Sequence, residues 1–303
     1  MKNSDFPNIH CVIFNSQRGA ALMVVLWVMV LLTVIASEFV FSMRTEMNIT
    51  INFKEDAEAY YAALAGIEEA KSEILSIENE MKLDDNGLLI FDEKQPHREG
   101  SIGNAKYSYD IIDEDSKLNI NTATPDQLRQ ILEYAEVEES LIDTIIDSIQ
   151  DWRDPDDLHR INGAEEEYYL SLPQPHSCKD GPFDTIEELL LVKGITPVIF
   201  SGSFETPVTQ GIEKYLTAKS SGAVNINTAD RIILKAAFGE AMAESIILQR
   251  PFLVPAGGYI VKSSNFTVIS IGISGRTKRV VKVILLKKPN GNIETAYWND
   301  NLI

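Results

Sequence analysis

The chain has 303 residues, and 45% of them are hydrophobic, so it can form a substantial apolar core. Its 45 acidic residues outnumber its 27 basic residues, which gives a formal net charge of −18. An acidic surface repels the phosphate backbone of nucleic acids and favours cations or basic partner surfaces. The composition therefore disfavours nucleic-acid binding. Many of the carboxylates are equally well explained by a soluble domain kept apart by its own charge.

An almost wholly apolar run, AALMVVLWVMVLLTVIA, begins directly after Arg18-Gly19. An ordinary secretory signal is cleaved after its apolar segment, whereas the junction of basic residue and glycine here precedes it. Cleavage after Gly19 would make Ala20 the new N-terminus and keep the apolar run as an anchor. This arrangement is typical of prepilin-type signals, and an uncleaved signal anchor is the simpler alternative.

Residues 20–41 are long enough to span a bilayer, which takes roughly 20 residues of helix. Lys2 and Arg18 precede this segment, and the long acidic part of the chain follows it. The positive-inside tendency places the N-terminus in the cytoplasm and the rest of the chain in the periplasm of a Gram-negative cell. The sequence therefore predicts a single-pass protein of the inner membrane.

Beyond the anchor, apolar residues at helical spacing predict that the helix continues from residue 42 to about residue 81. Segments 106–115 and 265–287 have the pattern of strands, and the second predicts two strands joined by a turn at 274–277. Helical patterns lie between them, at 124–134, 138–153, 185–193, 196–200 and 229–238. We expect an α+β fold in which a small antiparallel sheet is interrupted by a large α-helical insertion. Two domains in series are the competing arrangement.

These expectations divide the chain into a leader (1–19), a transmembrane segment (20–41), a stem helix with the first part of the sheet domain (42–115), a helical insertion (116–250) and a C-terminal β part (251–303). Cys11 lies in the leader, so cleavage would leave Cys178 without a disulfide partner in its own chain. We expect Cys178 to be a free buried thiol.

The insertion contains an internal repeat, because LNINTA at 118–123 recurs as VNINTA at 224–229. Each copy is followed by a helix start, and the first has Thr124 as N-cap with Pro125 at the first helical position. Such units resemble helix-hairpin-helix modules, which grip DNA phosphates at a hairpin like the one at 191–195 (LVKGI). Phosphate binding needs several cations nearby, whereas acidic residues dominate around the first copy. We expect a structural helical fold, and the alternative is a membrane-anchored DNA-binding protein of a DNA-uptake system.

The densest group of carboxylates lies at 151–169, DWRDPDDLHRINGAEEEYY. Carboxylates this close repel one another unless a cation or solvent relieves them, and calcium takes roughly six to eight oxygen ligands. The spacing is not that of an EF-hand loop. A divalent cation and a solvated acidic turn are both open interpretations.

The sequence has few of the patterns that catalysis requires. None of the four histidines lies beside a serine or cysteine nucleophile motif, and no glycine-rich phosphate loop leads into a helix. We therefore expect a protein without enzymatic activity.

The order of these motifs resembles the K class of minor pseudopilins of the type II secretion system. The resemblance rests on the Arg18-Gly19 junction with its anchor, both copies of the repeat, the acidic segment, and FDTIEELLLVKGI at 183–195. It implies a pseudopilin sheet with a helical, SAM-like insertion that binds calcium. Carried onto this sequence, the implied ligand candidates are Asp151, Asp154, Asp156, Glu165 and Glu167.

The resemblance also implies a position at the tip of a fibre. Most pilins carry a glutamate at the fifth residue of the mature chain, where it pairs with the N-terminus of the neighbouring subunit. Counted from Ala20, that position is Val24. An unpaired glutamate in an apolar stem is costly, so a subunit without one needs no subunit above it.

The implied partners belong to the same secretion system. A prepilin peptidase would cut after Gly19 and could methylate the amine of Ala20. The mature chain would then begin pseudopilus assembly together with minor pseudopilins of the I, J and H classes and with the major pseudopilin.

Overall fold

The protein is described by a computed structural model over residues 17–76, 81–83, 89–91, 98–203, 210–255 and 259–302. It has two compact units, residues 1–54 and 55–303. The first contains the apolar part of helix α1 (Gln17–Ser76), which is long and apolar enough to cross a membrane. The helix predicted from residue 42 is confirmed as far as Ser76. Most of the predicted leader, including Cys11, lies outside the described residues.

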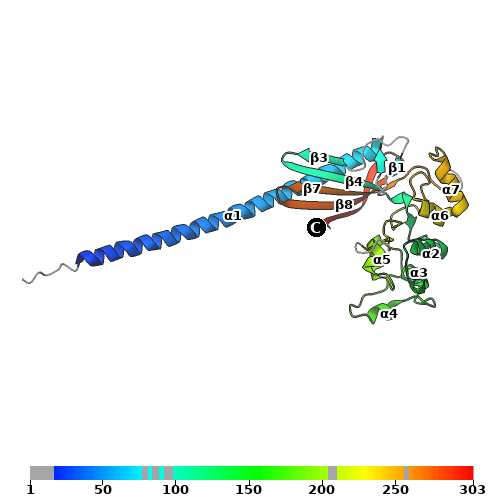
Figure 1. Cartoon of the computed structure of the whole chain (residues 1–303), viewed down its shortest axis with the longest axis horizontal. Helices are drawn as coiled ribbons and strands as arrows, with labels where there is room; N and C mark the ends of the chain where they lie inside the picture. The colour runs from blue at the N-terminus through cyan, green and yellow to red at the C-terminus, as the bar shows by residue number, and fades with distance from the viewer. Residues whose placement is uncertain are drawn as a thin grey trace, which may run out of the picture. The chain divides into compact units, whose positions relative to one another are not determined.

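The second unit contains a five-stranded antiparallel sheet with the strand order β3-β4-β7-β8-β9 (Figure 1). Its strands are β3 (Arg98–Ile102), β4 (Ala105–Asp113), β7 (Asn265–Ser274), β8 (Thr277–Lys287) and β9 (Ile293–Leu302). The predicted hairpin is confirmed by β7 and β8, whereas β3, β9 and the small pair β1 (Met81–Leu83) and β2 (Leu89–Phe91) were not predicted. Because β4 and β7 are neighbours in one sheet, the structure contradicts two domains in series.

Residues 55–76 of α1 cover one face of this sheet at very short range. Gly272 of β7 lies against the helix backbone, and a Cβ atom there would overlap the carbonyl oxygen of Ala59. Small residues on the facing side of α1 permit this approach, and Ala59, Ala62, Ala63 and Ala70 are fully buried. Lys287 donates a hydrogen bond from Nζ to the carbonyl of Ile74 at 2.7 Å, which places a cation at the end of α1.

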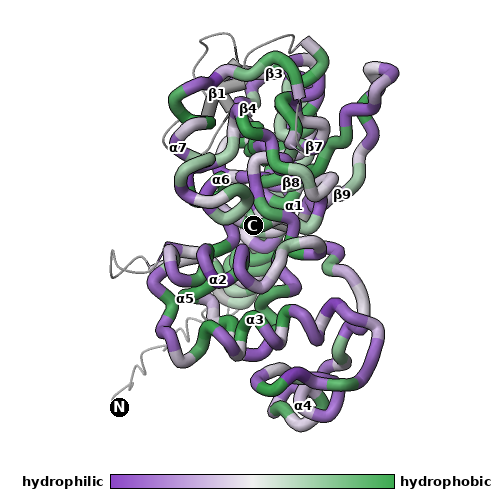
Figure 2. Tube along the Cα trace, turned by 90° about the vertical axis from the view of Figure 1, so that its right-hand side faces the viewer, coloured by the Kyte–Doolittle hydropathy of each residue, from purple (hydrophilic) through white to green (hydrophobic). Residues whose placement is uncertain are grey.

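The helical insertion connects β4 to β7. Its helices are α2 (Pro125–Tyr134), α3 (Glu139–Arg153), α4 (Glu166–Leu170), α5 (Pro197–Ser201), α6 (Arg231–Phe238) and α7 (Glu240–Gln249). It also has two 3-10 helices, η1 (Glu114–Ser116) and η2 (Ile186–Leu191), and a parallel pair, β5 (Leu118–Asn119) and β6 (Leu216–Thr217). Along α2 and α3 hydrophilic and hydrophobic residues alternate, as in helices that cover a core (Figure 2). The helix predicted at 185–193 is instead the shorter η2, and α4 and α7 were not predicted.

The two copies of the sequence repeat form the same local structure. In the first copy Asn119 Oδ1 accepts from the Asn121 backbone N–H at 2.8 Å, and the Asn121 side chain both donates to and accepts from the backbone of Phe183. The second copy repeats these contacts at Asn225, Asn227 and Phe252. The repeated asparagines therefore fix loops that lie far away in the sequence.

Each copy also accepts hydrogen bonds from an arginine at the C-terminal end of the second helix of its pair. Arg153 donates to the carbonyls of Ile120 and Ala123 at 2.6 and 3.0 Å. In the second copy the same contacts join Arg250 to Ile226 and Ala229, both at 2.5 Å. Each arginine thus holds the end of its helix pair against the turn that begins it.

Replacing Arg250 with alanine should lower the free energy of unfolding of residues 55–303 by about 2 kcal/mol, because charge-assisted hydrogen bonds to two carbonyls are lost. Urea unfolding measures this. Arg231→Ala is the matched control: Arg231 is exposed and pairs only with acidic side chains, so its loss should cost less than about 1 kcal/mol. Equal losses for both variants would contradict the structural role of Arg250.

Buried carboxylates join the insertion to the sheet where β4 ends. Asp113 accepts hydrogen bonds from Thr228 Oγ1 and Ser263 Oγ, both at 2.5 Å. Asp115 accepts from the backbone N–H groups of Ser264 and Asn265. Burial raises the pKa of Asp113 to about 7, which the neighbouring Asp115 carboxylate reinforces.

Candidate metal centre

The acidic segment begins in the last turn of α3 and ends in α4. Asp151 is fully buried, and its carboxylate accepts from Arg160, through the backbone N–H at 3.1 Å and through the guanidinium at 2.6 Å. The same guanidinium donates to Asp154 Oδ2 at 2.6 Å. A Cβ atom at Gly163 would overlap the Asp151 carboxylate, so a glycine is needed where the loop passes it. Arg160 therefore offsets much of the negative charge of Asp151 and Asp154.

Glu165 has no such compensation. It is only 6% exposed, and neither carboxylate oxygen has a hydrogen-bond partner among the described residues; Asp154 Oδ1 is unpartnered in the same way. Burial, together with the nearby carboxylates of Asp151 and Asp154, raises the pKa of Glu165 to about 7, although the Cys178 thiol acts to lower it. A buried carboxylate without a donor costs free energy unless a proton or a cation neutralises it.

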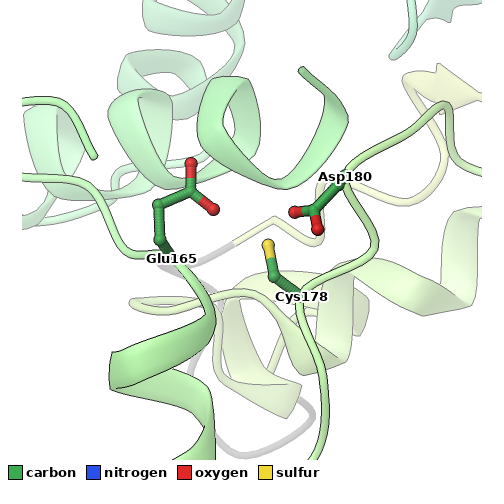
Figure 3. A group of neighbouring side chains, drawn as sticks. All are labelled: Glu165, Cys178 and Asp180. Carbon is green, nitrogen blue, oxygen red and sulfur yellow. The ribbon is translucent and has the colours of Figure 1, made fainter. Parts of the chain in front are cut away.

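Glu165 forms a cluster with Cys178 and Asp180, in which one ligand atom from each residue lies within 4.8 Å of the others (Figure 3). Cys178 is a buried free thiol, as predicted, and burial raises its pKa to about 12. A thiol that stays protonated is a poor ligand for a hard cation, whereas the two carboxylates are good ones. The oxygens of Glu165 and Asp180 thus suit calcium, and the sulfur does not add to the fit.

The structure separates the predicted ligands into two groups. Asp151 and Asp154 both interact electrostatically with Glu165. Asp156 and Glu167 are exposed, and one oxygen of Asp156 accepts from the Leu158 backbone N–H at 2.9 Å. Asp180 was not predicted as a ligand, because it lies outside the acidic segment 151–169 in the sequence. The folded chain brings it close to Glu165. The one local signal of Asp180 is the turn sequence Asp180-Gly181.

The predicted hairpin at 191–195 also forms. Gly194 has a φ of 88° between η2 and α5, a conformation that favours glycine. Lys193, the basic residue beside it, donates from Nζ to the carbonyls of Asn162 and Gly163. This lysine therefore holds the acidic loop in place.

Comparison with known proteins matches residues 105–202 to the family described as type II secretion system protein K. A putative type II secretion system protein K from Escherichia coli K12 is 28% identical over 202 residues, and protein K from Pectobacterium carotovorum is 26% identical over 265 residues. Over these regions the chain is similar to the type II secretion system protein K family. The matches cover 61% and 78% of this chain, and 60% and 76% of the respective relatives.

A solved protein K structure has the same fold. It comes from the GspK-GspI-GspJ complex of enterotoxigenic Escherichia coli, and the match has a TM-score of 0.59 at 16% identity. The match covers 86% of this chain and 99% of the solved chain. The recognition made from the sequence and the predicted α+β fold are thereby confirmed.

Proposed function

We propose that this chain is a minor pseudopilin at the tip of the periplasmic pseudopilus, where it begins assembly and supports protein export. The observation that carries the proposal is the stem: an exposed apolar helix follows Gly19, and its fifth residue is Val24 instead of a carboxylate. Every subunit below the tip needs a group that pairs with the subunit above it. A stem without that group fits the uppermost position, and its role is structural, not enzymatic.

The proposed partners follow from the family and from the solved relative. That relative was crystallised with GspI and GspJ, which supports minor pseudopilins of the I and J classes as partners of this chain. The H-class and major pseudopilins complete the proposed fibre. Prepilin peptidase would cleave the inner-membrane precursor after Gly19, with the N-terminus in the cytoplasm and the head in the periplasm.

The tip position can be tested by labelling. In cells that lack their own copy and overproduce the major pseudopilin, a tagged chain should restore fibre formation, and gold particles should mark fibre ends only. Particles spread along the fibres would contradict a tip position. Fibres that form equally well without the chain would contradict a role in beginning assembly.

Replacing Leu26 with aspartate should abolish membrane insertion, because a carboxylate within the apolar spanning segment costs up to about 3 kcal/mol. Fractionation of cells should then show the chain absent from the inner membrane, whereas Leu26→Met should insert normally. Normal assembly of the aspartate variant would show that the stem is not the anchor.

We also propose that the insertion binds calcium through Glu165, Asp180 and Asp154. Bound calcium would balance the negative charge of the Glu165 carboxylate, whose oxygens have no hydrogen-bond partner among the described residues. The three residues come from the loop after α3, the start of α4 and the loop after α4, so their carboxylates would then hold these segments together.

A further inference from the structure

The sheet face opposite α1 carries apolar side chains through its middle. Ile269, Ile271 and Ile273 lie at alternate positions of β7, so they share this face, and Val280 of β8 pairs with Ile271. Ile273 is 47% exposed, and the other three are half-buried. The uncovered face of an antiparallel sheet is usually polar, so this apolar column differs from the expected alternation.

Two lysines flank the exposed end of the column. Lys106 of β4 and Lys278 of β8 are the direct cross-strand neighbours of Ile273, and both are exposed. Neither forms an ion pair with another residue of the described ranges. In a chain of net charge −18, the exposed end of the column therefore presents local positive charge beside apolar area, while Asp110 and Glu99 lie on the same face further along β4 and β3.

The other end of the column leads into a groove of about 890 Å³ between the sheet and the insertion. Ile269 of the column and its cross-strand neighbour Lys282 both line the groove. Further apolar side chains line the groove, from the sheet and from the insertion: Ile112, Ile284, Tyr297, Ile186 and Tyr215. A volume of this size is typical of sites that receive a ligand or a side-chain cluster.

We propose that this face is a docking surface for a folded exported protein that presents an apolar patch rimmed by carboxylates. The apolar patch of the exported protein would contact Ile271 and Ile273, and its acidic rim would lie against Lys106 and Lys278. The inference rests on the proposed function, in which stems pack along α1. The face lies on the side of the sheet away from α1, so it stays accessible to proteins outside the fibre.

The test uses full-length chains in cells that lack their own copy. The variant Ile273→Ser/Lys106→Glu/Lys278→Glu should lower secretion of an acidic exported protein of the system at least tenfold, with fibre number unchanged. Leu248→Ser/Lys235→Glu/Lys288→Glu is the matched control, since it makes the same charge change and removes one exposed apolar side chain elsewhere. Equal amounts of chain in the membrane fraction confirm that all variants fold.

A direct measurement accompanies the secretion assay. A photo-crosslinking residue at position 273 should form an adduct with the exported protein, and one at position 248 should not. Unchanged secretion by the variant would overturn the docking surface, and so would a parallel loss of fibres, which would assign the face to contact between pseudopilins. If the wild-type chain restores neither fibres nor secretion, the proposed function itself fails.

Discussion

Replacing Gly272 with alanine should lower the free energy of unfolding of residues 55–303 by about 3 kcal/mol, a loss typical of overpacked cores. The new Cβ atom would overlap the backbone of α1 at Ala59, and a backbone cannot rotate away as a side chain can. The helix would have to lift from β7, and the buried contacts of Ala62, Ala63 and Ile67 would loosen with it.

Urea unfolding measures this loss, and Gly181→Ala is the matched control. A Cβ atom at Gly181 would meet nothing closer than the Lys179 carbonyl oxygen at 3.7 Å, so that variant should stay within about 0.5 kcal/mol of wild type. If Gly272→Ala is equally mild, α1 does not pack on the sheet as closely as described.

Without divalent cations, the free energy of unfolding should fall as the pH rises from about 5 to 8. The pKa of Glu165 is about 7 in the folded state and ordinarily 4.5, so the folded state keeps a proton that the unfolded state has lost. Stability is therefore fully present below the unfolded pKa and is lost as the pH rises through the folded one. The shift corresponds to at most about 3 kcal/mol.

At pH 8 calcium should restore most of the free energy of unfolding that is lost when Glu165 ionises, because the cation neutralises the carboxylate in place of the proton. Melting curves with calcium and with a chelator measure the difference, and a hundredfold excess over Kd corresponds to about 2.7 kcal/mol. Glu165→Gln should melt higher than wild type in chelator and should gain less from calcium. Identical curves with calcium and chelator would show that calcium does not bind at this site. The pKa of Asp113 is also about 7, so Asp113→Asn identifies the part of the pH dependence that calcium leaves unchanged.

The sequence predicted those elements whose signals are local. The hairpin of β7 and β8 follows from alternating residues around Ser274-Gly275, and α2 begins where Thr124 and Pro125 predict, with Thr124 and Gln127 forming a capping box. The edge strand β9 has the sequence IETAYWNDNL, which lacks a clear alternation and contains poor strand formers. It is a strand because β8 offers hydrogen-bonding partners, which no local pattern reveals.

The cluster of Glu165, Cys178 and Asp180 could be predicted only in part, for a similar reason. The dense group of acids includes Glu165, but the spacing did not show that Arg160 turns back onto Asp151 and Asp154. It also did not show that Asp180 approaches Glu165 from another loop. Which carboxylates stay uncompensated depends on how the loops fold, and this decides where a cation would bind.

Both chain connections of the insertion leave the sheet at the same end, where Asp113 pairs with Phe266. A force on the insertion directed along the strands would therefore enter through β4 and β7 at once. Such a force slides strands past one another and loads many hydrogen bonds together, whereas a force across the strands peels them apart one by one. The unit of residues 55–303 should accordingly resist a load along these strands far better than a load across them.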